Sequence, residues 1–199
     1  MSGAGTLTGY RARTYALVRD TMRALGPIAN AADIGAGEGW YARALMDDGV
    51  IARCTPVEVT RRALTIVEPV LYDGARLPFP DRSVELVYAV DVVHHAHDPL
   101  ALLDEMSRVA SRWIVLKDHT YQTALGRFTL AVLDELGNRR FGIPSPGRYQ
   151  RAWSWLPRLE ASGFVVRTLM HPAPCHAHIL GALTNRLQFV AAFERLHAH

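Results

Sequence analysis

The segment that most constrains the fold is a glycine-rich loop, placed where a short apolar run gives way to a helical pattern: Asp33-Ile34-Gly35-Ala36-Gly37-Glu38-Gly39-Trp40. Glycine lets the backbone turn tightly and approach a ligand without an intervening side chain. Dinucleotide-binding enzymes carry G-x-G-x-x-G at the same place. Here the third glycine comes one position early, and Trp40 stands where that pattern has a small residue. Asp33 would repel a pyrophosphate but suits an ammonium group. The loop therefore predicts a ligand other than a dinucleotide.

Apolar, β-branched runs alternate with helical patterns around this loop. Most of the runs are continuously apolar, as strands buried on both faces are. The predicted strands are residues 28–34, 55–59, 67–72, 84–93, 112–117, 163–170 and 187–193. The predicted helices are residues 13–25, 40–48, 60–64, 99–110 and 153–162. This order predicts an α/β, Rossmann-like, doubly wound and mainly parallel seven-stranded sheet, which binds ligands beyond the carboxyl ends of its strands.

Residues 120–150 depart from simple alternation. They contain an amphipathic helix that ends at Gly137-Asn138, with its apolar face made by Leu125, Phe128, Val132, Leu133 and Leu136. An insertion after the fifth strand lies above the carboxyl edge of the sheet, so we expect a helical lid over the ligand. An extra packing helix without substrate contact is the alternative.

The length and composition fit one soluble domain. We expect a single domain over residues 1–199, with an N-terminal helical cap at residues 1–26, because 199 residues with 49% hydrophobic side chains can bury one core. No apolar run reaches the roughly 18 residues of a membrane span, and the first residues lack a secretory signal. Two cysteines fit a reducing compartment, so the predicted location is cytoplasmic, without a membrane partner. The net charge of +3 is spread along the chain, which does not favour a nucleic-acid partner.

Acidic residues follow the next two predicted strands. Glu58 ends the second, where a carboxylate can accept hydrogen bonds from both hydroxyls of a ribose. Asp73 follows the third, where it could accept a hydrogen bond from an adenine amino group. Each acid alone is more often a solvated turn residue. Together with Asp33, they predict a nucleoside-binding edge.

These residues carry a family resemblance. The chain resembles the class I S-adenosylmethionine-dependent methyltransferases, and among them the small-molecule group of methyltransferase type 11, in residues 28–119 and through Asp33–Gly39, Glu58, Asp73–Asp81, Val84–Val87 and His94-His95. By this resemblance, Asp33 and the backbone of Gly35, Gly37 and Ala89 hold the methionine moiety, Glu58 the ribose, and Asp73 and Gly74 the adenine, with Val59 and Leu77 beside the ring. Ala36, Gly39 and Ala75 complete the cofactor set. A departure is Arg108-Val-Ala-Ser-Arg112, where the family has a Leu-Lys-Pro-Gly-Gly turn.

Methyl transfer requires the protein to position an acceptor and, where needed, to remove a proton. Candidate bases at the ends of strands four and five are His94, His95, Asp118 and His119, because imidazole titrates near neutral pH. A structural role is the alternative for each histidine. Possible substrate-binding residues are Tyr10, Tyr15, Tyr121 and Tyr149.

No metal is predicted. His171, Cys175, His176 and His178 are ligand-type residues, but they lack a paired Cys-x-x-Cys and lie in a proline-containing segment that predicts a loop.

The sequence thus predicts a methyltransferase that uses S-adenosylmethionine, releases S-adenosylhomocysteine and acts on a small-molecule acceptor in secondary metabolism. Two alternatives stay open. One is a reaction such as cyclisation on the same cofactor and fold. The other is methylation of a macromolecule. The turn Val90-Asp-Val-Val-His-His95 disfavours it, because this turn lacks the Asn/Asp-Pro-Pro-Tyr-like pattern of base-flipping enzymes. A homodimer is also left open.

Overall fold

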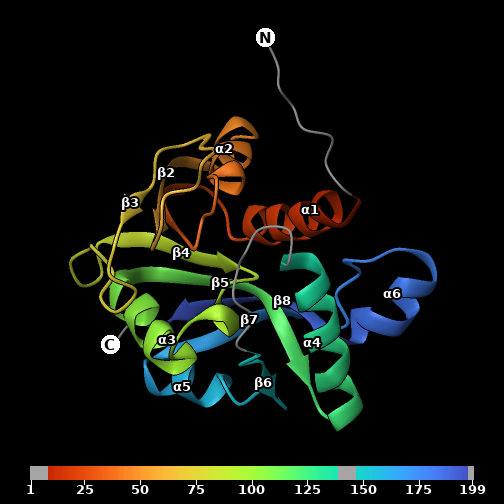
Figure 1. Ribbon diagram of the computed structural model, residues 1–199. Coiled ribbons are helices and arrows are strands. Elements are labelled where there is room, and N and C mark those ends of the chain that lie inside the picture. Colours follow the sequence, from red (N-terminus) through yellow and green to blue (C-terminus); the bar gives the residue numbers. More distant parts are fainter. Residues whose placement is uncertain (1–8, 139–146, 197–199) are drawn as a thin grey trace.

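The computed structural model describes residues 9–138 and 147–196. Its centre is a sheet in the order β3-β2-β1-β4-β5-β8-β7, with β6 paired to the end of β5 (Figure 1). The strands from β3 to β5 are parallel, and β8 runs antiparallel to both β5 and β7. The prediction of a Rossmann-like, mainly parallel sheet is therefore confirmed.

The bounds of the elements are as follows. The strands are β1 (Ile28–Ile34), β2 (Ile51–Glu58), β3 (Val70–Leu71), β4 (Val84–Val90), β5 (Ala110–Tyr121), β6 (Gln150–Arg151), β7 (Phe164–Met170) and β8 (Gln188–Arg195). The helices are α1 (Gly9–Arg23), α2 (Trp40–Asp47), α3 (Pro99–Val109), α4 (Ala124–Asn138), α5 (Leu156–Ala161) and α6 (His178–Thr184), with 3₁₀ turns at Val93–His95 and Asn185–Leu187.

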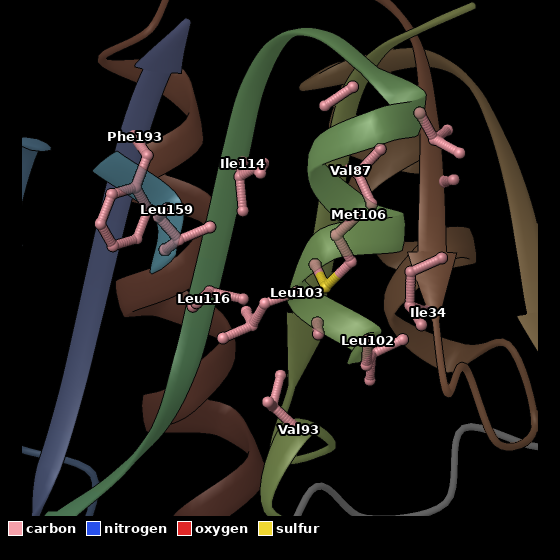
Figure 2. Packing of buried hydrophobic residues seen from close by; sticks show 14 of the residues in the cluster. Ile34, Val87, Val93, Leu102, Leu103, Met106, Ile114, Leu116, Leu159 and Phe193 are labelled. Carbon is pink, nitrogen blue, oxygen red and sulfur yellow. The ribbon is translucent and has the colours of Figure 1, made fainter. Parts of the chain in front are cut away.

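Helices cover both faces of the sheet, and each face has its own apolar core. On one face α3 and α5 pack over β1, β4, β5 and β8, with Leu103 and Met106 of α3 against Val87 and Ile114 of the sheet (Figure 2). On the other face α1 and α2 bring Val18 and Leu45 against the strands. Asp98 caps α3 by accepting hydrogen bonds from the backbone N–H groups of Leu100 and Ala101. The burial of β4 and β5 on both faces explains their apolar sequences.

The prediction of a helix at residues 60–64 is wrong. The structure has no helix between β2 and β3. Instead, the N–H of Ile66 donates to the carbonyl of Glu38 in the glycine loop, at 2.7 Å. Arg61 forms a two-point ion pair with Glu68. A five-residue helix is unstable by itself, so these contacts decide the path of the chain.

The ends of β4 and β5 also differ from prediction. β4 ends at Val90 rather than at residue 93, because Asp91 has a left-handed backbone with φ 56°. β5 continues to Tyr121 rather than ending at residue 117, because β8 and β6 pair with its last residues. Asp118 and His119 therefore lie within β5.

The predicted amphipathic helix is α4, which directly follows β5. Gly126 and Leu130 make its buried side, whereas Leu125, Phe128, Val132 and Leu136 are exposed. Residues 139–146 of the expected lid lie outside the described residues, and closure over a ligand stays a prediction. Residues 1–8 of the expected N-terminal cap also lie outside them. Among the described residues, no helix is long and apolar enough to cross a membrane.

Candidate active site

The glycine loop joins β1 to α2, and the space beside its central glycine is unfilled. Gly35, Gly37 and Gly39 all have left-handed φ values, of 66°, 61° and 79°. A Cβ at Gly35 would lie 2.5 Å from Cγ1 of Val92, and one at Gly39 would lie 2.8 Å from the carbonyl oxygen of Val67. A Cβ at Gly37 would meet nothing within 4 Å. Packing thus requires glycine at the two ends of the loop, and the middle faces open space.

Asp33 lies at the end of β1, directly before this loop. The side chain is buried, and its Oδ2 atom has no hydrogen-bond partner. Burial raises the pKa of Asp33 to about 8, although a hydrogen bond from Tyr88 favours the ionised carboxylate. A buried, unpaired carboxylate oxygen is costly, and an ammonium group bound at the loop would remove that cost.

The other two predicted acids also lie at the carboxyl edge. Glu58 is buried and accepts hydrogen bonds from the N–H groups of Gly37, at 2.9 Å, and Val59, at 2.8 Å. Each oxygen keeps a lone pair for a ligand hydroxyl. Asp73 is exposed, and its Oδ1 accepts from the N–H groups of Ala75 and Arg76. These bonds lower the pKa of Asp73.

The remaining predicted cofactor residues line the same edge. A Cβ at Gly74, which has φ 80°, would lie 3.4 Å from Cγ1 of Val59, a half-exposed side chain. Ala36 donates its N–H to the carbonyl of Val57 at 3.1 Å. Ala89 of β4 is buried and pairs with Ile34. The predicted residues thus lie in or beside the carboxyl ends of β1 to β4, and their binding of the donor stays a prediction. The donor set fits an ammonium group at Asp33 and a diol at Glu58.

A second cluster surrounds His94, in the 3₁₀ turn after β4. Nδ1 of His94 donates to Oδ1 of Asp118 at 2.6 Å, and the N–H of Val93 donates to Oδ2 at 3.0 Å. The N–H of His119 donates to Oδ1 at 2.7 Å, and the Nδ1 atoms of His119 and His94 are 3.5 Å apart. Asp118 thus fixes the turn that carries His94 against β5.

The charges in this cluster differ between its two central histidines. Burial disfavours the charged form of His94, but the Asp118 carboxylate outweighs it and raises the pKa of His94 to about 10. Burial and the positive charge of Lys117 lower the pKa of His119. Burial would raise the pKa of Asp118, but the charge of His94 holds it well below its ordinary value. His119 is therefore the neutral imidazole, and the one suited to accept a proton.

The helix α4 adds an acid to this cluster. Oδ1 of Asp134 lies 3.6 Å from Nε2 of His94 and 3.5 Å from Nε2 of His95. Its Oδ2 accepts a hydrogen bond from the hydroxyl of Tyr149 at 2.9 Å, and the Tyr149 ring packs 5.3 Å from that of His94. Burial would raise the pKa of Asp134, but the neighbouring His94 and His95 lower it to about 2.

A buried network lies beside these histidines. Lys117 is fully buried and donates to Asp91, to the hydroxyl of Tyr10 at 2.6 Å, and to Gln188 at 2.7 Å. The hydroxyl of Tyr10 donates to Oδ2 of Asp91 at 2.8 Å. Nε2 of His119 is 3.8 Å from Oδ1 of Asp91. Burial would lower the pKa of Lys117, but the Asp91 carboxylate outweighs it and keeps the lysine charged.

The four predicted substrate tyrosines have different surroundings. Tyr10 and Tyr149 belong to the two networks above. Tyr121 packs beside Tyr149, in the small apolar group that contains Leu130. Tyr15 instead donates to the carbonyl of Ala44 and to Asp48 in and just after α2, so the structure does not bring it to His94.

Sequence reasoning missed Asp91 and Asp134. Asp91 directly follows β4, and the carboxyl-edge argument used for Glu58 could have found it. Asp134 had no such signal, because it occupies one inward position of a mainly apolar helix. In the segment judged not to bind metal, Nε2 of His171 is 2.9 Å from the Arg186 carbonyl, and Nδ1 of His176 is 2.9 Å from the Thr184 hydroxyl.

Comparison with known proteins supports the interpretation of this edge. Residues 32–112, which include the glycine loop, Glu58, Asp73 and His94, match the family model described as a methyltransferase domain, of type 11. The resemblance to class I methyltransferases of this type is thereby confirmed. The match spans less than half of the 199 residues.

Two related proteins are also named as methyltransferases. Two uncharacterized methyltransferases of Mycobacterium leprae, from strains TN and Br4923, are each 32% identical over 121 residues. Each alignment covers 50% of this chain and 44% of the relative, so the match spans less than half the length of those proteins.

Solved structures share the fold of the methyltransferase domain. The Haloferax volcanii putative methyltransferase in complex with the activator Trm112 has a TM-score of 0.68 at 16% identity, covering 98% of this chain and 95% of that one. An S-adenosylmethionine-dependent methyltransferase of Aquifex aeolicus has a TM-score of 0.58 at 17% identity, with coverages of 90% and 89%. The [4+2]-cyclase SpnF has a TM-score of 0.67 at 16% identity, with coverages of 100% and 85%.

Proposed function

We propose that this protein transfers the methyl group of S-adenosylmethionine to a small-molecule acceptor and releases S-adenosylhomocysteine. The observation that carries the proposal is the unpaired, buried Oδ2 of Asp33, which lies directly before a glycine loop whose central glycine faces open space. The methyltransferase domain matched by residues 32–112 provides independent support.

In this proposal, different residues bind different parts of the cofactor. Asp33 receives the ammonium group of the methionine moiety, Glu58 the ribose hydroxyls, and Asp73 the adenine amino group. Val59 and Gly74 border the adenine ring. The bound sulfonium supplies an activated methyl group, so the protein has to position the acceptor and exclude water.

His119 is the proposed proton acceptor where the acceptor group carries a proton. The low pKa of His119 keeps its imidazole neutral near pH 7, and a neutral imidazole is a general base. Asp118 orients the turn that holds His94 beside His119. Of the four predicted tyrosines, Tyr10 and Tyr149 are the two whose positions suit acceptor binding.

Isothermal titration with S-adenosylhomocysteine tests the cofactor assignment. We expect micromolar binding by the wild type and at least tenfold weaker binding by Asp33→Asn and by Glu58→Gln, because each removes a carboxylate that receives a polar group. Glu160→Gln on α5 is the control, since that acid is exposed and far from the glycine loop in sequence and fold. Unchanged affinity in both site variants would contradict the assignment.

The alternative is a reaction without methyl transfer, such as cyclisation. The similarity in fold to the [4+2]-cyclase SpnF supports considering it. Incubation with cofactor labelled in the methyl group separates the two, using a panel of phenols, amines and polyenes. Label in the acceptor supports methyl transfer. A rearranged, unlabelled product with intact cofactor supports cyclisation.

A further inference from the structure

The feature that the proposed function leaves unexplained is the far nitrogen of His94. This side chain is only 1% exposed, and its Nε2 has no hydrogen-bond partner. Nε2 of His95 and Nε2 of His94 both point to one oxygen, Oδ1 of Asp134, at 3.5 and 3.6 Å. These atoms belong to a group of potential metal ligands that all lie within 4.8 Å of one another.

We propose that His94, His95 and Asp134 bind one divalent transition-metal ion. An ion held by nitrogen and oxygen atoms at about 2.0–2.2 Å in tetrahedral geometry separates neighbouring ligand atoms by about 3.4 Å. The two separations from Asp134 lie close to this value. A charge-assisted hydrogen bond would instead be about 2.7–2.9 Å long. The contact from Nδ1 of His94 to Asp118, at 2.6 Å, is a hydrogen bond of this short kind.

The surroundings of the three ligands favour a metal as well. Ligating histidines usually donate their other ring N–H to a carboxylate, which fixes the tautomer. Nδ1 of His94 donates to Asp118, so Nε2 is the nitrogen left to bind an ion, which would take the place of the Nε2 proton. Ligating carboxylates are in turn hydrogen-bonded, and Oδ2 of Asp134 accepts from Tyr149. The site thus has the outer contacts that position metal ligands.

The donor set identifies the class of ion. Two imidazoles and one carboxylate suit Zn²⁺, Fe²⁺ or Co²⁺, whereas Mg²⁺ favours oxygen ligands. Three protein ligands leave positions for water or for an oxygen of the acceptor. The site follows β4, beside the glycine loop that Val92 contacts. A metal here would lower the pKa of an acceptor hydroxyl. This role rests on the proposed function, whereas metal binding itself does not.

The competing explanation is a proton in place of the metal, with His94 as an imidazolium between Asp118 and Asp134. It accounts for the two carboxylates around His94. It lets the Asp134 carboxylate attract His95, but it does not require the two Nε2 atoms to lie at matching separations from one oxygen, as coordination of one ion does. Metal binding therefore requires His95, whereas the proton explanation does not.

Titration of the full-length, chelator-treated protein with Co²⁺ and then Zn²⁺ tests the proposal. Calorimetry gives the stoichiometry, and visible Co²⁺ absorption reports on the coordination geometry. To remove adventitious sites, His197 and His199 are replaced by alanine in every sample. We expect one ion per chain, with Zn²⁺ displacing the Co²⁺ spectrum.

Variants locate the site. His95→Ala and Asp134→Asn should each weaken binding at least tenfold, and Tyr149→Phe should weaken it about tenfold as a positioning residue. His97→Ala is the matched control, because this histidine is exposed in the same segment. Circular dichroism checks that all variants fold. Absence of one-to-one binding, or equal affinity in His95→Ala, Asp134→Asn and His97→Ala, would overturn the proposal.

The two proposals fail separately, because the metal titration contains no cofactor and the S-adenosylhomocysteine titration contains no metal. If the metal binds and the cofactor product does not, the metal site stands and the proposed function falls.

Discussion

The hydroxyl of Tyr10 donates a hydrogen bond of 2.8 Å to Oδ2 of Asp91, which joins the first helix to the end of β4. The same hydroxyl accepts from Lys117 of β5 at 2.6 Å. One phenol thus connects α1 to both central strands at the edge where the proposed donor site lies. An unpaired polar group in a buried network of this kind is costly.

Replacement of Tyr10 by phenylalanine should therefore destabilise the protein. The change removes one donor from Asp91 and one acceptor from Lys117, and we expect a loss of about 1–3 kcal/mol in the free energy of unfolding. Urea denaturation measures it. Tyr15→Phe is the control, because its hydroxyl bonds to the part-exposed Asp48, and its loss should be at most about 1 kcal/mol. Equal losses would show that burial of the network is unimportant.

Lys117 should matter more than Tyr10. Lys117→Met leaves the Asp91 carboxylate without its cation, and breaking a buried ion pair costs about 3–5 kcal/mol. Adding Asp91→Asn to this variant removes the unpaired charge and should restore part of the stability. A double-mutant cycle from denaturation curves measures the coupling between the two residues. Additive losses would mean that the pair does not interact.

The sequence predicted the fold well because its signals are local. Continuous apolar strands, the Asp98 cap and the glycine loop each depend on neighbouring residues, and the structure has most of them near the predicted places. The exceptions include β2, which begins at Ile51 rather than residue 55, and β3, which is only Val70–Leu71 rather than residues 67–72. The errors came from contacts distant in sequence. Residues 60–64 follow the glycine loop through the bond from Ile66 to Glu38, and β5 extends through Tyr121 because β8 and β6 pair with it.

The candidate site was predictable only where its residues follow strands. Glu58 and Asp73 could be found because parallel strands end at one edge. Asp134 could not, because only the packing of α4 over β5 brings it to His94 and His95. The same packing leaves Leu125 and Phe128 exposed, so the apolar pattern of that helix did not identify its buried side.

The glycine loop should separate packing from ligand binding. Gly35→Ala would place a Cβ 2.5 Å from Val92, so we expect a clear loss of stability, partly restored by adding Val92→Ala. Gly37→Ala has open space, and its left-handed backbone should cost only about 1–2 kcal/mol. Its new methyl group would, however, enter the proposed cofactor space. Thermal unfolding and S-adenosylhomocysteine titration measure both effects. Full binding by a folded Gly37→Ala variant would argue against this location.

The pKa of Asp33 makes stability depend on pH. The unfolded aspartate ionises near its ordinary value of 3.8, whereas the folded one keeps its proton up to a pKa of about 8. Between these values the folded state binds more protons, so stability decreases as pH rises from about 4 to 8. Asp33→Asn lacks this titration. Urea denaturation at pH 5 and pH 8 should therefore show wild type losing stability relative to Asp33→Asn at the higher pH.

Ligand binding should reverse this effect. An ammonium group beside Asp33 favours the carboxylate, so S-adenosylhomocysteine should displace its proton at pH 7. Calorimetry in buffers with different ionisation enthalpies counts the released protons, and we expect close to one for wild type and none from this position in Asp33→Asn. Equal proton release by both proteins would show that the ammonium group binds elsewhere, and the unpaired Oδ2 would then need another partner.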